Sequence, residues 1–370
     1  MKRRQLIRQV AIGAASASTM VACSRNNQLL SSNGQQSNNV RVEWRMATSW
    51  TESLDVVFGT SKLLCERVSE LTNGNFVITP YPAGGIAPPL EILDTVSTAQ
   101  AECGHSAGYY YTAKNPALAF ATSVPFGLNP AQHFAWLYGG TGLDALRKIY
   151  ADFNVINFPG GSTGNQMGGW FKKQLQSLDE IKGMKMRVPG LGGKVWKQLG
   201  AETQNLPPAE IGPALDQGKI DAAEWVGPYE DEKLGLNKSA PFYYYPGWHE
   251  PGTTYEFMVN KPAWEKLPKD YQTALSVAAF EAHTKMIARY DALNREALQR
   301  LEKGGTKLVL FSPELLKAAE KTAFSIYEEN ASTDATFREL YTNWNNFRRA
   351  IYEWNHINES SFANIEIARS

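Results

Sequence analysis

The sequence predicts an α/β protein with two α/β layers and mixed, mostly parallel sheets. Between Val40 and Phe311, short strand-like runs alternate with amphipathic stretches of helical period, which is the pattern of strand–helix–strand units. One segment, 268–303, keeps a helical pattern without a break, and at 1.5 Å per residue such a helix is about 54 Å long. A helix of this length is expected to span more than one sheet as a shared support.

The composition is that of an ordinary globular protein. The chain has 370 residues, with 37 Lys and Arg against 37 Asp and Glu, and 43% of it is hydrophobic. This length allows a large core and predicts two domains. The balanced charge gives no support to a nucleic-acid partner, and the sequence has no apolar run of 18 residues that would predict a transmembrane helix.

The first 39 residues differ in kind from the rest. Residues 1–22 carry four basic side chains, no acid and a short apolar stretch, which is the pattern of an export signal peptide. The Arg-Arg pair at positions 3 and 4 resembles a twin-arginine signal. The residues before Cys23 resemble a lipobox, so Cys23 is the expected lipid anchor; the alternative is a plain signal peptide with a fortuitous Cys. Residues 23–39 are rich in Ser, Asn and Gln and predict a polar linker.

Glycine and proline mark the element boundaries of the first half. Hydrophobic residues alternate strictly from Val40 to Met46, which predicts a half-buried strand. A helical stripe over 54–71 is closed by Gly74, a typical C-cap. The further elements expected before residue 163 are a strand at 76–81, a helix at 91–100, a strand and loop at 102–111, a helix at 129–150, and a strand at 155–158 ended by Pro159-Gly160-Gly161.

A second series of elements follows, and a helical region closes the chain. We expect strands at 167–172, 184–188 and 222–226, helices at 192–199 and 209–217, and a last strand at 308–311 after the long helix. From Pro313 the pattern is helical and rich in aromatic residues, namely Tyr327, Phe337, Tyr341, Trp344, Phe347, Tyr352 and Trp354. This stripe predicts packing against the body of the protein, and the alternative is a homodimer surface on the C-terminal helix.

One motif favours an enzyme. Gly104-His105-Ser106-Ala107-Gly108 matches the nucleophile elbow of α/β-hydrolases, with Ser106 as the nucleophile. An elbow should lead directly into a helix, but Tyr109-Tyr110-Tyr111 follows in a predicted strand or loop. A secreted hydrolase is therefore the alternative function. Cys65 and Cys103 are expected to be buried free thiols, and the alternative is that they pair in an oxidising compartment.

Charged residues at strand ends mark the candidate binding site. Arg187 lies near the carboxyl end of a predicted strand, where clefts form in open α/β sheets, and its guanidinium suits bidentate capture of a carboxylate. Glu224 ends another strand and Glu250 lies in an aromatic-rich loop, and acids in such surroundings need a cationic partner. Gln166 adds an amide oxygen from a Gly-rich segment. Two carboxylates, an amide oxygen and a backbone carbonyl make an oxygen site for a hard cation.

Several motifs between Val40 and the end of the long helix resemble a known family. They are Pro80-Tyr81-Pro82-Ala83-Gly84, Lys182-Gly183-Met184-Lys185-Met186-Arg187 and Ala214-Leu215-Asp216-Gln217-Gly218-Lys219-Ile220-Asp221. In this order and spacing the sequence resembles the substrate-binding subunit of tripartite ATP-independent periplasmic (TRAP) transporters, the DctP-like family. Two blocks, Glu224-Trp225-Val226-Gly227-Pro228 and Tyr245-Pro246-Gly247-Trp248-His249-Glu250-Pro251, resemble its cation-dependent branch, which binds 2-oxo acids and lactate-like monocarboxylates.

The resemblance implies a two-lobed, periplasmic-binding-protein-like fold with hinge strands and a long helix that spans both lobes. Lobe I would comprise 40–162 plus about 251–290, lobe II 163–250 plus about 291–330, and the C-terminal aromatic-rich helix 331–370. The family resemblance also implies a periplasmic protein that is not an enzyme. Such a protein captures a small carboxylate and passes it to the small and large integral membrane subunits of the transporter.

The resemblance also implies roles for individual residues. Arg187 would pair with the substrate carboxylate. The cation, Na⁺ or Ca²⁺, would be bound by the side chains of Gln166, Glu224 and Glu250 and by the carbonyl oxygen of Trp225, and no organic cofactor is expected. Gln166 would also contact the substrate, whose tail would lie against apolar walls. The aromatic candidates for these walls are Tyr110, Trp248, Phe126 and Trp50.

Overall fold

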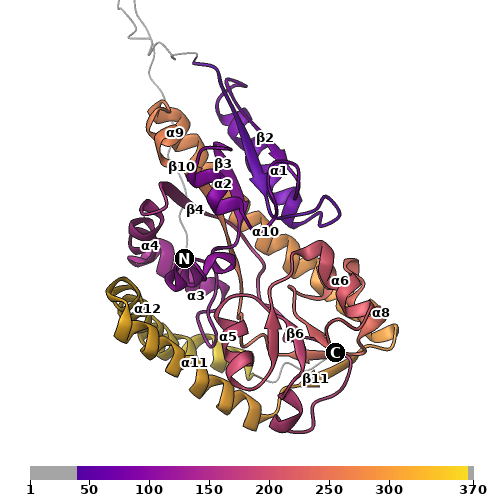
Figure 1. Cartoon of the computed structure of the whole chain (residues 1–370). Helices are drawn as coiled ribbons and strands as arrows, with labels where there is room; N and C mark the ends of the chain where they lie inside the picture. The colour runs from indigo at the N-terminus through magenta and orange to yellow at the C-terminus, as the bar shows by residue number, and fades with distance from the viewer. Residues whose placement is uncertain (1–39, 366–370) are drawn as a thin grey trace, which may run out of the picture. The chain divides into compact units, whose positions relative to one another are not determined.

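Two mixed β-sheets form the framework of residues 40–365, the part of the chain that the computed structural model describes (Figure 1). The α/β class predicted from the sequence is confirmed. The expected signal peptide, Cys23 and the polar linker lie outside the described residues. Within residues 40–365, no helix combines the length and the apolar character needed to cross a membrane.

The first sheet has five strands in the order β2-β1-β3-β10-β4. β1 is parallel to β2 and β3, whereas β10 is antiparallel to β3 and β4. All residues of β10 are buried, as expected for a strand paired on both edges. The bounds are Val42–Thr48 for β1, Phe76–Tyr81 for β2, Cys103–Ser106 for β3, Val155–Ser162 for β4 and Thr254–Asn260 for β10.

Helical segments connect and cover these strands. α1 packs against β2 and against the long helix α10, which also packs on β4. Cys65 on α1 and Cys103 on β3 are buried free thiols, as expected. The bounds are Val57–Leu71 for α1, Ile92–Ser97 for α2, Gly108–Tyr111 for η1, Pro116–Ala121 for η2, Pro130–Phe134 for α3, Ala135–Gly139 for η3 and Gly142–Ala151 for α4.

The second sheet has six short strands in the order β11-β9-β5-β8-β6-β7. β6 is parallel to β7 and β8, β11 is parallel to β9, and β5 is antiparallel to β8 and β9. Its strands are β5 Gly169–Phe171, β6 Lys185–Arg187, β7 Glu202–Gln204, β8 Ala222–Ala223, β9 Phe242–Tyr245 and β11 Lys307–Leu310. The helices between them are η4 Leu178–Ile181, α5 Gly190–Gln198, α6 Pro208–Asp216, α7 Pro228–Lys233 and α8 Leu236–Ser239.

The predicted long helix is α10, which runs over Lys269–Lys303 and follows the short α9 (Lys261–Glu265). It starts after Pro268 and ends before Gly304 and Gly305, and the φ angle of Gly305 is +95°. α10 packs against α1 and β4 from the first sheet (Figure 1) and against α7, which follows β8 of the second sheet. One continuous helix therefore contacts the first sheet directly and the helix that follows β8 of the second sheet, while the division into two lobes stays a prediction.

The C-terminal region consists of two helices, α11 (Pro313–Thr333) and α12 (Ala335–Asn355), followed by the short η5 (His356–Ser360) and α13 (Ser361–Ala363). The Ser312 hydroxyl caps α11, and the Asp334 carboxylate caps α12 by accepting from the Thr336 N–H at 2.8 Å. Three aromatic residues of the predicted stripe, Tyr327, Phe337 and Trp344, are fully buried, whereas Trp354 is 58% exposed. Packing against the body is confirmed for the inner part of the stripe.

Two predicted element boundaries in the first half are wrong, and Gly108–Tyr111, expected in a strand or loop, forms the short 3₁₀ helix η1. The helix expected over 129–150 is interrupted: α3 continues directly into η3, and the extended backbone of Gly140 separates η3 from α4. The strand expected to end at Phe158 continues to Ser162. It passes through Pro159 because the pairing with β10 shifts register between Tyr255 and Glu256, and proline is tolerated at such a bulge.

A third boundary error concerns the candidate site. The strand expected over 222–226 ends at Ala223. The Asp231 carboxylate accepts hydrogen bonds from the backbone N–H groups of Val226, at 3.0 Å, and Gly227, at 3.1 Å. A side chain that takes backbone donors in this way competes with strand pairing. Glu224 and Trp225 consequently lie just beyond the end of β8.

Candidate functional site

Arg187 and Glu224 meet where two neighbouring parallel strands end. Arg187 is the last residue of β6 and pairs in register with Ala223, the last residue of β8. The Arg187 guanidinium donates through Nη1 to the Glu224 carbonyl oxygen at 2.7 Å and forms an ion pair with the Glu224 carboxylate, and Nε donates to the Leu206 carbonyl at 3.2 Å. Both side chains are buried. The remaining nitrogen, Nη2, has no hydrogen-bond partner among residues 40–365.

A second carboxylate, Glu250, lies close to this pair. It is buried, its Oε2 accepts from the Thr253 hydroxyl at 3.1 Å, and its Oε1 has no partner within the described residues. Burial raises the pKa of Glu250 well above its ordinary value, and the negative charge of Glu224 raises it further. Arg187 opposes this shift, but its single positive charge already pairs with Glu224. With both carboxylates ionised, the single guanidinium leaves an excess negative charge in this buried region, so the raised pKa favours a protonated Glu250 when no cation compensates that charge.

Gln166 joins the cluster through its amide group. Its nitrogen donates to the Thr253 hydroxyl at 3.0 Å. The amide oxygen then faces only oxygens of Glu250, the carboxylate Oε2 at 3.2 Å and the carbonyl at 3.3 Å. Two arrangements relieve this contact: the amide turns over so that its nitrogen donates to Glu250, or a cation lies among the oxygens. Oxygen atoms at this separation are compatible with a shared Ca²⁺, whose ligands lie at about 2.3–2.6 Å.

The available donors define which ion could bind. Within residues 40–365, no cluster of three His, Cys, Asp or Glu side chains suited to a metal is present. The oxygen set consists instead of two carboxylates, one amide and nearby backbone carbonyls. Oxygen donors of this kind suit a hard cation such as Ca²⁺ and lack the nitrogen and sulfur atoms that Zn²⁺ favours.

Aromatic side chains enclose the charged cluster. The Arg187 guanidinium lies 5.4 Å from the centre of the Trp225 ring, and Trp225 packs on Trp50 with ring centroids 6.5 Å apart. Tyr110 packs on the same Trp50 at 6.4 Å, and its buried hydroxyl has no partner within residues 40–365. Burial raises the pKa of Tyr110 while the charge of Arg187 lowers it, so the phenol remains protonated and can donate a hydrogen bond.

The Trp50 indole is committed to a structural contact. Its Nε1–H donates to Nδ1 of His105 at 2.7 Å. Nδ1 of His105 also lies 2.9 Å from the Ser61 hydroxyl. Burial lowers the pKa of His105 to about 4, so the ring is neutral and can accept. Trp50 is thus placed as an apolar wall, and its N–H is not available to a ligand.

Phe126 and Trp248 form a separate aromatic pair. Their rings stack with centroids 5.3 Å apart and an interplanar angle of 22°. Trp248 precedes His249 and Glu250 in the chain, and its ring also packs on Trp196 at 5.3 Å. The structure therefore joins Gln166, Arg187, Glu224 and Glu250 with the wall residues Tyr110, Trp50 and Trp225. It places Phe126 and Trp248 beside this group through the residues next to Glu250.

Some residues of the site were missed by the sequence reasoning. The His249 ring is buried with Nε2 3.5 Å from Glu224 Oε2, and Thr253 bridges Gln166 and Glu250. Neither residue type carries a local signal, although both lie within three residues of Glu250. Asp231 was also missed. It fixes the segment after Glu224, and its Oδ2 accepts from Trp170 Nε1 at 2.9 Å and from the Tyr243 hydroxyl at 2.7 Å.

The Ser106 motif does not form a nucleophile elbow. Ser106 is fully buried, and its hydroxyl shares hydrogen bonds with the Ser49 hydroxyl at 2.6 Å and the Tyr111 hydroxyl at 2.7 Å. The adjacent His105 is occupied by Trp50 and Ser61. A triad needs a base on the serine and an acid on that base, and Ser106 has neither. The hydrolase alternative is therefore not supported at this position.

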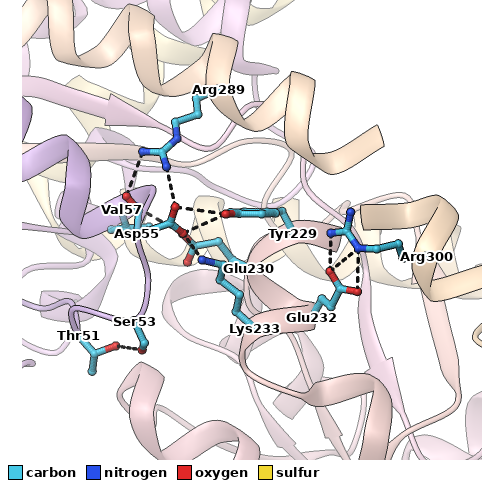
Figure 2. Close-up of polar contacts among 10 residues, drawn as sticks. All are labelled: Thr51, Ser53, Asp55, Val57, Tyr229, Glu230, Glu232, Lys233, Arg289 and Arg300. Carbon is cyan, nitrogen blue, oxygen red and sulfur yellow. Dashed lines mark hydrogen bonds and ion pairs between the residues drawn. The ribbon is translucent and has the colours of Figure 1, made fainter. Parts of the chain in front are cut away.

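A second polar cluster lies beside the site, on α7. Figure 2 shows Asp55, in the loop before α1, in contact with Tyr229 and Lys233 of α7 and with Arg289 of α10. The Asp55 carboxylate accepts from the Tyr229 hydroxyl at 3.2 Å and from Arg289 Nη2 at 2.6 Å, and it pairs with Lys233. These contacts tie the helix that follows the Glu224 segment to α10 and to the loop that follows Trp50.

Comparison with known proteins identifies a matching family and similar chains. The family model described as bacterial extracellular solute-binding protein, family 7 (DctP), matches residues 46–334. A relative from Nostoc sp. is named a monocarboxylate 2-oxoacid-binding periplasmic protein. It is 55% identical over 364 residues, which cover 98% of each chain.

Solved structures with the same fold hold ligands. A TRAP transporter solute-binding protein from Bordetella bronchiseptica has a TM-score of 0.86 and 43% identity over 88% of this chain and 96% of its own. That structure is a mixed-occupancy dimer with calcium and picolinate in one site. A Colwellia psychrerythraea protein with calcium and pyruvate has a TM-score of 0.85 and 36% identity, over 88% of this chain and 99% of its own. A Pseudoalteromonas atlantica protein with sodium and pyruvate has a TM-score of 0.86 and 33% identity, over 88% of this chain and 100% of its own.

Proposed function

Because the chain belongs to the DctP family of bacterial extracellular solute-binding proteins, we propose that it binds a small 2-oxo monocarboxylate together with a metal cation. Pyruvate is the simplest such ligand. The observation that carries this proposal is the buried cluster of one guanidinium and two carboxylates, in which Arg187 Nη2 and Glu250 Oε1 have no hydrogen-bond partner among the described residues.

The substrate carboxylate pairs with Arg187. Nη1 of this side chain is taken by Glu224, and Nη2 is the nitrogen left for a ligand. The Tyr110 hydroxyl, which is also unpartnered, is a second donor for the same carboxylate. Charge-assisted hydrogen bonds of this kind are about twice as strong as neutral ones.

The cation is bound by oxygen atoms of Gln166, Glu224 and Glu250 and by the carbonyl oxygen of Trp225. The substrate carboxylate and 2-oxygen complete its shell. Arg187, the two glutamates and a monoanionic substrate sum to a charge of −2. A divalent cation neutralises this sum and a monovalent cation halves it, so either ion lowers the cost of burying the cluster.

The apolar walls hold the rest of the substrate. Trp225 and Tyr110 pack on Trp50, and Trp248, two residues before Glu250, stacks on Phe126. A short tail such as a methyl group needs little room, so the size of this region decides between pyruvate and longer 2-oxo acids.

The chain acts as a carrier in the periplasm and not as an enzyme. It delivers the substrate to the membrane subunits of a TRAP transporter after the two predicted lobes close around it. The N-terminal segment directs export, with Cys23 as a lipid anchor. The C-terminal helices provide a surface for a homodimer, supported by the exposed apolar residues Trp354, Ile357 and Phe362 and by the dimer of the Bordetella protein.

Thermal unfolding with candidate acids tests the proposal. We expect pyruvate or a branched 2-oxo acid, with Ca²⁺ or Na⁺, to raise the midpoint, since a ligand at 100 times its Kd adds about 2.7 kcal/mol. Succinate, a dicarboxylate without a 2-oxo group, is the control and is expected to add less. No shift with any 2-oxo acid in the presence of either cation would contradict the proposed function.

A further inference from the structure

The loop at residues 124–128 is held by side chains of the two C-terminal helices. The Tyr327 hydroxyl of α11 donates to the Pro125 carbonyl at 2.7 Å. From α12, Arg348 Nε donates to the Phe126 carbonyl at 2.9 Å and the Tyr352 hydroxyl donates to the Gly127 carbonyl at 2.6 Å. Three successive carbonyl groups of an irregular segment thus accept hydrogen bonds from side chains of the C-terminal helices.

The held conformation is one that Phe126 does not favour by itself. Its φ angle is +52°, in the left-handed region that is unfavourable for a non-glycine residue because of steric contact with its Cβ. The next residue, Gly127, leaves no room for a side chain, since a Cβ there would lie 2.5 Å from the Val124 carbonyl oxygen. Such a backbone persists only where the surrounding contacts determine it.

The result of this conformation is a contact with the candidate site. The Phe126 backbone N–H donates to the Trp248 carbonyl at 2.7 Å, and its ring stacks on the Trp248 ring. Trp248 precedes Glu250 by two residues, so the position of Trp248 constrains that carboxylate. A continuous series of contacts leads from α12 through Phe126 and Trp248 to Glu250.

Arg348 is itself fixed on its helix. Its guanidinium carbon lies 4.4 Å from the Tyr352 ring centre, 4.9 Å from that of Phe324 and 5.8 Å from that of Trp344. Cation–π contacts of this kind orient the side chain. The side chain of the neighbouring Arg349 is exposed, and among residues 40–365 it makes no hydrogen bond or ion pair.

We propose that Arg348 and Tyr352 are positioning residues that hold Phe126 against Trp248 and thereby set the room for the substrate tail. This inference rests on the proposed function, because it assigns selectivity to the same site. When the anchors are removed, the 124–128 loop relaxes and the wall loosens. Affinity for pyruvate then falls more than affinity for a bulkier acid such as 4-methyl-2-oxopentanoate.

The test compares matched substitutions on α12 in the full chain. The variants are Tyr352→Phe, which removes one oxygen atom, and Arg348→Met with Tyr352→Phe. Tyr341→Phe and Arg349→Met are the controls. Calorimetric titration with both acids in Ca²⁺ gives the ratio of the two Kd values. We expect the double variant to lower the preference for the smaller acid at least fivefold and Tyr352→Phe to lower it at least twofold, with the controls within 1.5-fold of the wild type.

Phe126→Ala shows whether the anchors act through this ring. If they do, Phe126→Ala changes the preference by itself, and adding Tyr352→Phe to it has no further effect. A general loss of stability would lower both affinities without moving their ratio. An unchanged ratio in Tyr352→Phe and in the double variant, or additive effects with Phe126→Ala, overturns the inference while pyruvate binding by the wild type stands. If the wild type binds no 2-oxo acid, the proposed function fails first and the inference fails with it.

Discussion

Two clusters of charged side chains lie at the two ends of one short stretch, residues 224–233, and they differ in burial. At one end Glu224 joins Arg187 and Glu250, all at most 2% exposed. At the other end Lys233 joins Asp55 and Arg289, with side chains that are 31–47% exposed. Both clusters use carboxylates and cationic side chains, so the comparison isolates the effect of the surroundings.

The difference in surroundings changes what the same groups can do. Partial burial raises the pKa of Asp55, but Lys233 and Arg289 lower it by more, so Asp55 is ionised and well paired, with water to screen the excess charge. At Glu250, burial and a second carboxylate raise the pKa, and no water compensates. The exposed cluster therefore contributes modestly to stability. In the buried cluster, two ionised carboxylates exceed the charge of one guanidinium, and a cation bound together with the ligand can compensate this excess.

The largest effect is expected from breaking the buried pair. Arg187→Met keeps much of the side-chain volume but leaves Glu224 as an unpaired buried charge, which costs about 3–5 kcal/mol. We expect the Kd for pyruvate to rise at least 100-fold in calorimetric titration.

Arg289→Met, which removes the same charge from the exposed cluster, is the matched control, with an expected change below about threefold. Equal effects of the two substitutions would remove the distinction between the clusters. Circular dichroism at the titration temperature establishes that both variants are folded.

An intermediate effect is expected at Glu230, which lies on α7 between the two clusters. Its Oε1 accepts from the Val57 N–H at 3.4 Å, Oε2 has no partner within the described residues, and burial raises its pKa to about 7. The neutral form is favoured in the folded state, so this contribution to stability is complete below about pH 4.5 and is lost as pH rises through 7.

Glu230→Gln removes this loss. In urea unfolding, the variant should equal the wild type near pH 4.5 and exceed it at pH 8 by about 1–3 kcal/mol, at about 1.4 kcal/mol per pKa unit. Glu232→Gln changes an exposed glutamate that pairs with Arg300 and should show no such pH-dependent gain. A constant difference between Glu230→Gln and the wild type across this pH range would contradict the assigned pKa.

The smallest effect is expected from the exposed cluster itself. Asp55→Asn weakens contacts to Tyr229, Lys233 and Arg289 (Figure 2), but exposed ion pairs contribute only about 0–1 kcal/mol each. We expect the free energy of unfolding to fall by about 1 kcal/mol at low salt and by less in 1 M NaCl. A loss above about 3 kcal/mol, or a loss that salt does not reduce, would mean that this cluster behaves like the buried one.

The sequence was sufficient to predict the parts of the site that depend on strand ends. Arg187 and Glu224 were each expected near the end of a predicted strand, and parallel pairing of β6 with β8 brings the two ends together. Glu250 was also predicted, because an acid within a run of aromatic residues needs a partner. The long helix followed from an uninterrupted period, and its bounds differ by one residue from the prediction.

The remaining features depend on contacts between residues far apart in the chain. Asp231 ends β8 early because its carboxylate accepts hydrogen bonds from two backbone N–H groups. No local sequence pattern predicts this role. Thr253 bridges Gln166 across 87 residues, and the α12 anchors reach Phe126 across more than 220 residues. Residue type and spacing do not predict such contacts. The charged groups of the site can therefore be identified from the sequence, but the residues that position them cannot.

Cooperative binding of calcium and pyruvate is the most direct consequence of the charge imbalance in the buried cluster. The measurement is a calorimetric titration of pyruvate into chelator-treated protein, without added metal, with CaCl₂ and with NaCl. We expect Ca²⁺ to lower the Kd for pyruvate at least 30-fold, pyruvate to raise the affinity for Ca²⁺ by the same factor, and Glu250→Gln to abolish both effects. Pyruvate binding that is equally tight in metal-free, sodium-loaded and calcium-loaded protein would contradict a shared site for substrate and cation.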